Sequence, residues 1–312
     1  MTASPAISII MPAFNASNTI KESISSVQAQ TLSDWELIII DDGSSDETLS
    51  VAFEAKAIDD RIRVFQQINS GPSVARNLGI RKSRAPILAF LDSDDLWAQT
   101  RLDSMLRALA PRPSVGVLFS RTRFISHDGQ KPGTLTRHFD QLSASDLLAE
   151  NAVCSTSNIV CRQEVFEDCG RFTPGLHHAE DQEWLLRVAL SQKWEVCGID
   201  EELFFYRSSP DSQSADLAAM YKGWQLFVMR LGAKFPAQIV EAAHKSYGPF
   251  CRALARRAIR AGKPIQALHY LRLGLLHDPL LVLRQPRRTL LTLCGAFAAC
   301  LPFSTLKELV AR

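Results

Sequence analysis

The stretch that decides the fold is Ile87-Leu88-Ala89-Phe90-Leu91-Asp92-Ser93-Asp94-Asp95-Leu96-Trp97. Its first five residues are apolar and predict a buried strand, because the run is too short for most helices. Asp92 and Asp94 are two positions apart, so an extended chain points both side chains to the same side. Carboxylates held this close together repel each other unless a cation compensates them. The stretch therefore predicts a strand that delivers carboxylates to a cation site.

The residue types also indicate which cation this site binds. Hard oxygen ligands with open coordination positions suit Mg²⁺ or Mn²⁺, which usually bind substrate phosphates as well. The alternative interpretation is an acidic turn that begins a helix, because Asp is favoured at that position. The remainder of the chain has to decide between the two.

Strands and helices alternate through the first 120 residues. The strands are expected at 7–11, 37–40, 62–65, 87–91 and 115–119, with amphipathic helical patterns between them. Two of these helices start with an apparent capping box, Thr19 with Glu22 and Ser44 with Glu47. The alternation predicts an α/β fold around a parallel sheet with right-handed crossovers. In such sheets, ligands bind outside the carboxyl ends of the strands.

A second expected strand, 37–40, also ends in acid, at Asp41-Asp42-Gly43. Both acid clusters therefore belong at the ligand-binding edge of the sheet, which turn chemistry alone does not explain. Gly43 and Gly71 allow tight turns and the close approach of a ligand. The chain has neither a G-x-G-x-x-G nor a P-loop pattern, which disfavours a dinucleotide or Walker-type site.

The middle of the chain continues the α/β pattern less regularly. Glu180 and Asp181 fall in the first turn of an expected helix, where acidic residues are also favoured for purely structural reasons. The remaining expectations are a loop over the site at 121–142, strands at 155–161 and 203–207, and a domain boundary at 208–212.

Charge divides the chain into two halves. Residues 1–210 contain 20 basic and 28 acidic residues, whereas residues 211–312 contain 15 and 5. The second half has helical periodicity, with an expected hairpin across Gly262-Lys263-Pro264. Its basic surface is either a solvated face or a contact with an anionic membrane. A nucleic-acid partner is disfavoured, because the basic residues have little aromatic interleaving.

Cysteine usage and hydropathy bear on the compartment. The seven cysteines have no metal-site spacing, which is typical of reduced thiols in a cytoplasmic protein. The amino terminus lacks the basic region of a signal peptide. No apolar run reaches the length of a membrane span, and the longest, 289–303, fits an interfacial or core helix. We therefore expect a cytoplasmic protein, with peripheral contact to the inner membrane face.

Taken in order, six motifs in the first 210 residues resemble the family 2 glycosyltransferases of the GT-A fold. They are Pro12-Ala13-Phe14-Asn15, Asp41-Asp42-Gly43-Ser44-Ser45-Asp46, Asn69-Ser70-Gly71 leading to Ala75-Arg76-Asn77-Leu78-Gly79, Leu91–Trp97, Glu180-Asp181 and Tyr206-Arg207. The resemblance implies an α/β GT-A fold, Rossmann-like with a mostly parallel central sheet. It implies a nucleotide-sugar-binding catalytic domain at 1–210, followed by a basic helical extension at 211–312.

The resemblance also implies roles for individual residues. The nucleotide-sugar donor would contact the turn that holds Pro12, Phe14 and Asn15, the carboxylates Asp41 and Asp42, and the loop at Gly71 and Arg76. Asp92 would serve both the donor and the metal. Asp92 and Asp94 would form the metal-binding pair, with Asp94 the main ligand and Asp95 beside them. Asp181 would be the general base that deprotonates an acceptor hydroxyl, and Glu180 would shape its surroundings.

The expected reaction is a metal-dependent, inverting transfer of one sugar, with Mn²⁺ or Mg²⁺ as cofactor. The chain lacks the Gln-x-x-Arg-Trp element of processive members, which favours one addition per encounter. UDP-sugars are the commonest donors of the family, and a glycan or lipid-linked oligosaccharide is the expected acceptor. Two other classes stay open: an inactive GT-A-like binding or scaffold protein, and a metal-dependent sugar nucleotidyltransferase.

Overall fold

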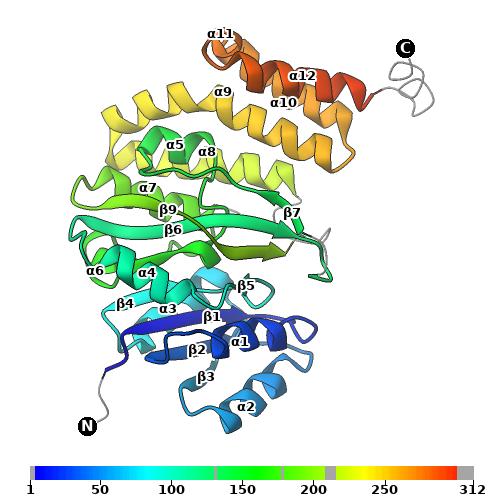
Figure 1. The fold of residues 1–312 in the computed structure, drawn as a ribbon. Helices are drawn as coiled ribbons and strands as arrows, with labels where there is room; N and C mark the ends of the chain where they lie inside the picture. Colours follow the sequence, from blue (N-terminus) through cyan, green and yellow to red (C-terminus); the bar gives the residue numbers. More distant parts are fainter. Residues whose placement is uncertain (1–3, 130–131, 177–178, 208–215, 301–312) are drawn as a thin grey trace. The chain divides into compact units, whose positions relative to one another are not determined.

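The computed structural model describes residues 4–129, 132–176, 179–207 and 216–300. The chain forms two compact units (Figure 1). The first unit comprises Met1–Ser143, Ala152–Leu176 and Glu180–Pro210, and the second is chiefly Ala144–Asn151 and Asp211–Arg312. Residues 144–151 thus belong with the helical second unit rather than with the first 210 residues. The expected boundary at 208–212 lies outside the described residues.

The first half of the first unit is a regular α/β layer. Its strands are β1 (Ile7–Ala13), β2 (Trp35–Asp41), β3 (Ile62–Gln66) and β4 (Ile87–Phe90), in the spatial order β3-β2-β1-β4 and all parallel. The helices between them are α1 (Ile20–Gln28), α2 (Thr48–Ile58) and α3 (Pro72–Lys82). β1 and β2 are buried along their whole length, which explains their nearly continuous apolar runs. The four strands expected here from the sequence are confirmed.

The second half of the first unit extends the sheet with mixed pairing. Its strands are β5 (Leu96–Trp97), β6 (Val115–Ile125), β7 (Pro132–Leu135), β8 (Val160–Arg162) and β9 (Glu195–Arg207). β8 is antiparallel to both β4 and β6, while β6 and β9 are parallel. The full order is β3-β2-β1-β4-β8-β6-β9-β5, with β7 paired to β6. Helices α4 (Arg101–Leu109), α6 (Glu164–Cys169) and α7 (Glu180–Leu190) complete the unit.

Two sequence expectations for this half are wrong. Residues 121–142 do not form one loop, because β6 runs on to Ile125 and β7 pairs with it. Residues 155–161 do not form one strand either: the 3-10 turn η1 (Thr156–Asn158) comes first. The Ser155 side chain accepts a hydrogen bond from the Ser157 amide at 3.1 Å, which favours a turn over a strand.

Neither expected capping box forms. Thr19 precedes α1 without a side-chain cap bond, and Glu22 pairs with Arg207 instead. α2 begins at Thr48, after Glu47, so Ser44 is not its N-cap. The Ser44 hydroxyl accepts the Asn15 amide at 3.0 Å. Long-range contacts therefore take the groups that a local capping box would use.

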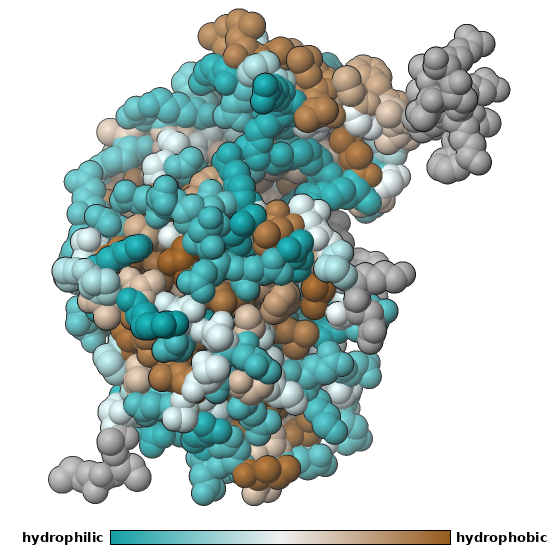
Figure 2. Space-filling model, viewed as in Figure 1, coloured by the Kyte–Doolittle hydropathy of each residue, from teal (hydrophilic) through white to brown (hydrophobic). Residues whose placement is uncertain are grey.

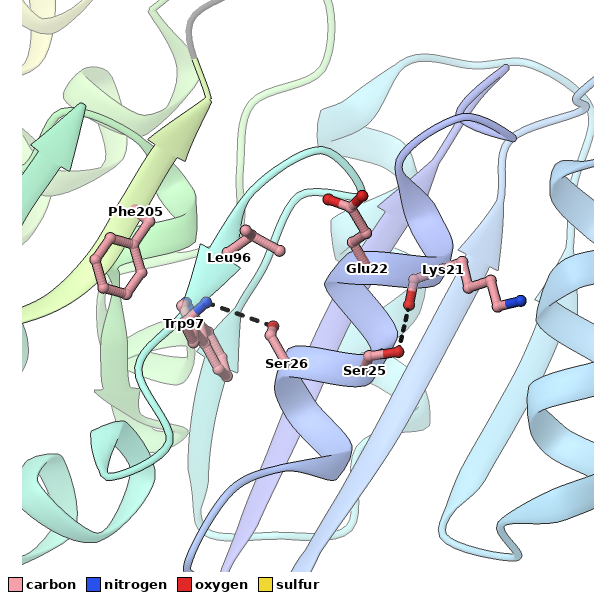
Figure 3. Close-up of a pocket in the computed structure, with 7 residues that line it drawn as sticks. All are labelled: Lys21, Glu22, Ser25, Ser26, Leu96, Trp97 and Phe205. Carbon is pink, nitrogen blue, oxygen red and sulfur yellow. Dashed lines mark hydrogen bonds between the residues drawn. The ribbon is translucent and has the colours of Figure 1, made fainter. Parts of the chain in front are cut away.

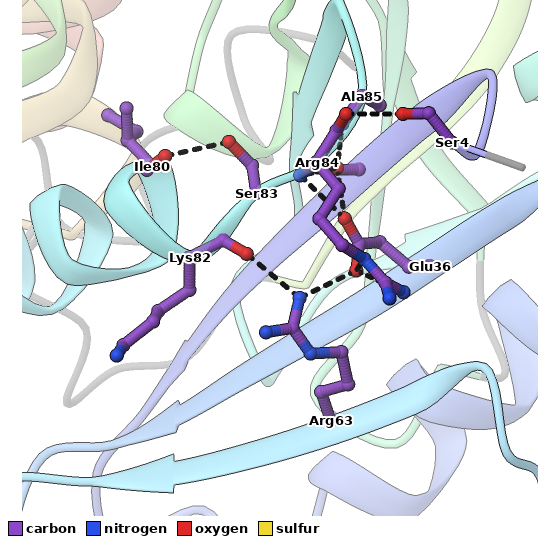
Figure 4. Close-up of polar contacts among 9 residues, drawn as sticks. Ser4, Glu36, Arg63, Ile80, Lys82, Ser83, Arg84 and Ala85 are labelled. Atoms are coloured by element: carbon purple, nitrogen blue, oxygen red, sulfur yellow. Dashed lines mark hydrogen bonds and ion pairs between the residues drawn. The ribbon is translucent and has the colours of Figure 1, made fainter. Parts of the chain in front are cut away.

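The amino ends of β1, β2 and β3 surround a buried carboxylate, Glu36 (Figure 4). Glu36 accepts hydrogen bonds from the Ser8 hydroxyl at 2.6 Å, from Arg63 at 2.8 Å and from the Arg84 side chain at 2.9 Å. Burial alone would raise the pKa of Glu36, but these hydrogen bonds and the Arg84 charge lower it below its usual value. The negative charge of Glu36 is therefore compensated by neighbouring groups of the fold at this end of the sheet.

The second unit is helical. It contains α5 (Ala144–Ala149), α8 (Leu217–Lys234), α9 (Pro236–Arg260), α10 (Pro264–His277), α11 (Leu281–Arg284) and α12 (Pro286–Ala298). α9 packs against α5, α8, α10 and α12, and the α9–α10 pair confirms the expected hairpin. Trp224 of α8 stacks on Phe250 of α9 at 4.9 Å between ring centroids. Among the described helices, none is long and apolar enough to cross a membrane.

Candidate active site

The turns that follow β1 and β2 hold each other in place. Asn15 adopts a positive φ of 48°, a conformation that Asn tolerates better than most residues. The side-chain oxygen of Asn15 accepts a hydrogen bond from the Ser45 backbone amide at 2.9 Å. The backbone amide of Asn15 donates to the Ser44 hydroxyl. Pro12 is buried within β1, whereas Phe14 is exposed at the rim. The two turns thus form one connected edge at the carboxyl end of the sheet.

Asp42 organises the loop that leads into α3. Its carboxylate accepts hydrogen bonds from the Gln67 side chain at 2.7 Å, the Ser70 amide at 2.9 Å and the Gly71 amide at 2.8 Å. Gly71 has a φ of 87°, in the left-handed region that favours glycine. Both oxygens of Asp42 are therefore engaged in shaping the loop that the sequence predicts to contact the donor.

Asp41 is fully buried beside this loop. One of its oxygens accepts the Ser44 amide at 3.3 Å and the Gln66 side chain at 3.2 Å. The other, Oδ1, has no hydrogen-bond partner among the described residues. A buried acceptor without a partner is costly, so this oxygen is a candidate to accept a hydrogen bond from a water or a ligand.

Arg76 of α3 connects two parts of the site that lie far apart in the sequence. Its guanidinium pairs with Asp92 at 2.6 Å and with Glu180 at 3.0 Å, and its side chain is almost fully buried. Burial alone would lower the pKa of Arg76, but the charges of these two carboxylates raise it. Arg76 therefore stays charged and compensates both Asp92 and Glu180.

Asp92 is held by more than this ion pair. The Ser155 hydroxyl lies 3.3 Å from Asp92 Oδ2 as a donor, and the Asp92 amide donates to the Ser157 hydroxyl at 2.9 Å. Trp97 donates its indole N–H to the Ser157 carbonyl at 3.0 Å. The turn at η1 thus fixes both ends of the acidic segment.

Asp94 lies in different electrical surroundings. Burial and the nearby Asp92 charge raise the pKa of Asp94 to about 6, although Arg207 and Arg76 act in the opposite direction. No ion pair to Asp94 is present in the part of the chain that the structure describes. Its charge therefore favours a cation that the protein itself does not supply.

Asp95 points into the protein. It is buried, and its Oδ1 accepts the Arg207 amide at 3.0 Å. Burial first, and then the charges of Asp94 and Asp92, raise its pKa well above the usual value. Because its side chain is committed to the backbone of β9, we do not retain Asp95 as a metal ligand.

Arg207, at the end of β9, clamps the acidic segment. Its side chain donates to the Asp94 carbonyl at 2.8 Å and the His127 carbonyl at 2.7 Å, and it pairs with Glu22 at 2.5 Å. Beside this clamp, a hollow of about 540 Å³ lies between α1, β5 and β9 (Figure 3). Leu96, Trp97 and Phe205 contribute its mainly apolar wall.

Glu180 and Asp181 begin α7, as expected. Glu180 is buried against Arg76, so it connects α7 to α3 and to Asp92. Asp181 is more exposed, and one of its oxygens accepts the Gln182 amide at 2.7 Å. The structure therefore places a more accessible carboxylate next to one that is committed to an ion pair.

These side chains fit a divalent cation only in part. Within the described ranges, no group of three or more His, Cys, Asp and Glu residues is arranged to hold a metal ion. Asp94, with Asp92 beside it, offers one or two carboxylates. Mg²⁺ and Mn²⁺ sites of this kind take their remaining ligands from water and substrate phosphates. The residues therefore fit a cation that binds together with a phosphorylated substrate.

Sequence reasoning missed several residues that hold this site. Ser155 and Ser157 fall within the strand expected at 155–161, and the sequence places Glu22 in a capping box. Nothing in their local sequence indicates contacts with residues 63 to 185 positions away. Arg207 does stand within a recognised motif, but its spacing alone does not reveal what it binds.

Comparison with known proteins defines the class. The family model described as "Glycosyl transferase family 2" matches residues 8–170, more than half of the chain. The chain belongs to this family and is a glycosyltransferase. The matched region includes both acidic segments and the loop at Gly71.

Two curated relatives are informative. "Putative teichuronic acid biosynthesis glycosyltransferase TuaG" of Bacillus subtilis (strain 168) is 29% identical over 226 residues, 72% of this chain and 87% of that protein. "UDP-Glc:alpha-D-GlcNAc-diphosphoundecaprenol beta-1,3-glucosyltransferase WfgD" of Escherichia coli is 42% identical over 101 residues. That second match covers 32% of this chain and 39% of WfgD.

Two solved structures show the same fold. TarS 1-349 of S. aureus in complex with UDP-GlcNAc has a TM-score of 0.60 at 16% identity and covers 90% of this chain and 92% of its own. Mannosyltransferase PcManGT from Pyrobaculum calidifontis, in complex with GDP-Man and Mn²⁺, has a TM-score of 0.60 at 17% identity, with 96% and 86% covered. The chain therefore has the GT-A fold with additional helices, as expected.

Proposed function

We propose that this chain is a metal-dependent, inverting glycosyltransferase that moves one sugar from a UDP-sugar to a hydroxyl of a glycan or lipid-linked acceptor. The observation that carries the proposal is the position of Asp94 beside Asp92 at the ligand-binding edge of the sheet, where no described residue forms an ion pair with Asp94. Structural carboxylates are normally paired when they are buried. A half-buried carboxylate without an ion pair among the described residues, at the ligand-binding edge of a glycosyltransferase sheet, suits a metal that arrives with the donor diphosphate.

The donor site in this proposal is the edge formed by the turns after β1, β2 and β3. Pro12, Phe14 and Asn15 would line one side of the nucleoside, with Asp41, Asp42 and the Gly71 loop on the other. UDP is favoured because the TarS complex contains UDP-GlcNAc and the name of WfgD specifies UDP-Glc. GDP is the competing base, since PcManGT was solved with GDP-Man.

The chemistry follows from the two kinds of carboxylate. A divalent cation held by Asp94, with Asp92 beside it, would act as a Lewis acid that neutralises negative charge on the departing nucleoside diphosphate. Asp181 accepts the proton of the acceptor hydroxyl. The ion pairs of Arg76 with Asp92 and with Glu180 hold Asp92 and the start of α7 in position. The hydroxyl oxygen forms its bond to the anomeric carbon as the diphosphate leaves, so one displacement inverts that carbon.

The acceptor in this proposal is a membrane-bound glycan intermediate of cell-surface polysaccharide biosynthesis. WfgD is named for a diphosphoundecaprenol-linked substrate, and TuaG for teichuronic acid biosynthesis. A cytoplasmic enzyme that reaches such a substrate contacts the inner membrane face peripherally. The basic character of residues 211–312 supports contact with anionic lipid.

Thermal shift with nucleoside diphosphates, with and without Mn²⁺, tests the donor and metal assignments together. A ligand that binds only the folded protein raises its melting temperature. We expect UDP to stabilise the protein only when Mn²⁺ is present, and Asp94→Asn to remove that effect. If every nucleotide gave the same result with and without metal, metal-dependent donor binding would be excluded.

A further inference from the structure

The second unit exposes an apolar face on its last two helices. Leu283 is 76% exposed, Leu291 is 74% exposed and Phe297 is 60% exposed. Other exposed residues of the same segment are Leu280, Leu290 and Cys294. Figure 2 shows hydrophobic side chains gathered over α11 and α12. We call these six residues the apolar face of α11–α12.

The spacing of α12 explains why this face points outward. Thr289, Thr292 and Ala296 recur at helical intervals and are buried. Leu290, Leu291 and Phe297 fall on the opposite side of the same helix. An ordinary surface helix buries its apolar residues and exposes its polar ones, but α12 buries two threonines and exposes leucine and phenylalanine. This reversed pattern indicates a surface that meets an apolar environment.

The basic residues nearby do not all face solvent. Glu150, which directly follows α5, pairs with Arg256 at 2.6 Å and with Arg288 at 3.2 Å, and it lies 3.7 Å from the buried Arg252. Part of the positive charge of the second unit is therefore paired with Glu150 of the same unit. Arg287 lies on the exposed side of α12, next to the apolar face. Basic charge alone therefore does not describe the contact surface, and the apolar face must be included.

We propose that the apolar face of α11–α12 lies in the interfacial layer of an anionic membrane. α12 has 13 residues and is about 20 Å long, too short to cross the roughly 30 Å hydrocarbon core. A helix of this length with an apolar face and flanking arginine suits a position parallel to the membrane plane. Of the three arginines in residues 279–300, Arg284 pairs with Asp278 and Arg288 pairs with Glu150. Arg287 is therefore the one without an ion pair among the described residues, and its exposed charge favours anionic headgroups.

The biological role of this membrane contact rests on the proposed function, because a lipid-linked acceptor resides in the membrane. The structural support for the contact is independent of the donor site. A contiguous exposed apolar surface is unusual on a protein that stays monomeric in water, and commonly marks a membrane or protein contact. The exposed Arg287 beside the apolar face favours an anionic membrane over an apolar protein partner.

Vesicle flotation of the full chain tests the inference. We expect wild type to bind phosphatidylcholine vesicles that contain about 30% phosphatidylglycerol, and to bind pure phosphatidylcholine more weakly. The triple variant Leu283→Ser, Leu291→Ser, Phe297→Ser should bind about tenfold less or weaker, because each substitution removes apolar area from the bilayer contact. The matched control, Ile58→Ser with Ile265→Ser, changes equally exposed apolar residues outside the face and should bind like wild type.

Three results would overturn the inference. One is equal vesicle binding by wild type and the triple variant. Another is binding that disappears entirely at about 0.5 M salt, where screening removes surface charge effects but not apolar insertion. The third is a wild-type dimer that the triple variant converts to monomer, without vesicle binding. UDP stabilisation in Mn²⁺, measured on the same samples without vesicles, reports separately on the proposed function.

Discussion

Glu36 and Asp94 are carboxylates at opposite ends of the strands of the same sheet, and Glu36 is buried whereas Asp94 is half-buried. Glu36, near the amino ends, accepts hydrogen bonds from Ser8, Arg63 and Arg84, which hold its pKa below the usual value. Asp94, beyond the carboxyl end of β4, has its pKa raised to about 6 by burial and by Asp92. Glu36 forms ion pairs within the fold, whereas Asp94 has none among the described residues.

The difference separates a structural acid from a ligand-binding one. In the sequence, Glu36 is a single acid within a strand and Asp94 belongs to an acid cluster after one, but neither pattern shows whether the fold supplies the acid with a basic partner. A fold gains nothing by burying an uncompensated carboxylate unless a partner arrives later. Asp92 stands between the two cases, because Arg76 already compensates it. This ranking supports Asp94 as the main metal ligand.

The largest expected effect is that of Asp94→Asn on turnover. Loss of the metal should cost several kcal/mol of transition-state stabilisation, or about 10³-fold or more in kcat/KM. The metal-free variant should melt at a higher temperature than wild type, because an uncompensated charge has been removed. Donor turnover and melting curves in EDTA measure the two effects. A variant with wild-type turnover would remove Asp94 from the metal site.

Asp181 and Glu180, at the start of α7, are a second pair of carboxylates with different expected roles. Asp181→Asn should lower kcat by roughly 10²–10⁴-fold, the range of general-base catalysis, while UDP binding is retained. Glu180→Gln should instead lower the melting temperature, because it breaks the ion pair with Arg76. Initial rates and nucleotide thermal shifts distinguish them. Full activity of Asp181→Asn would show that another group accepts the proton.

Glu36→Gln is the opposite test from Asp94→Asn. The change weakens charge-assisted hydrogen bonds from Arg63 and Arg84, so the free energy of unfolding should fall by about 2–3 kcal/mol. UDP binding per folded molecule should be unchanged, since Glu36 lies at the far end of the strands. Urea denaturation measures the first effect. Unchanged stability would mean that Glu36 is not the structural acid described here.

The pH dependence of stability should have opposite signs at the two carboxylates. The pKa of Asp94 is raised, so the metal-free folded state binds its proton more tightly than the unfolded state. Its contribution to stability therefore falls as pH rises from about 4 to about 6. The pKa of Glu36 is lowered, so its contribution is present above about 4.5 and is lost at lower pH.

Denaturation of wild type, Asp94→Asn and Glu36→Gln in EDTA at two pH values checks these signs. The stability advantage of Asp94→Asn over wild type should be larger at pH 7 than at pH 4.5. The stability deficit of Glu36→Gln should shrink as pH falls below about 4.5. Equal differences between wild type and Asp94→Asn at both pH values would contradict the raised pKa of Asp94.

Much of the first half of the fold could be predicted from sequence. The apolar runs of β1, β2 and β4 are local signals, and parallel strands bring their carboxyl ends to one edge. The antiparallel insertion of β8 between β4 and β6 could not be predicted. It depends on pairing between segments about 70 residues apart, which no local pattern records.

The candidate site, like the fold, could be predicted from the sequence only in part. Motif order and the acidic strand ends predicted which segments meet, but not which acid is compensated. That distinction depends on Arg76, Glu180 and Arg207, whose partners lie 16 to 185 positions away. The same long-range contacts explain why Glu22 does not cap α1 and why the Asp95 carboxylate binds the backbone of β9.

Mn²⁺ titration followed by electron paramagnetic resonance, with and without UDP, tests the central claim most directly. We expect wild type and Glu36→Gln each to bind one Mn²⁺ per chain when UDP is present and far less without it. Asp94→Asn should leave the metal free in both cases. Equal Mn²⁺ binding by wild type and Asp94→Asn, or binding that ignores UDP, would contradict the claim that Asp94 awaits a cation carried by the donor.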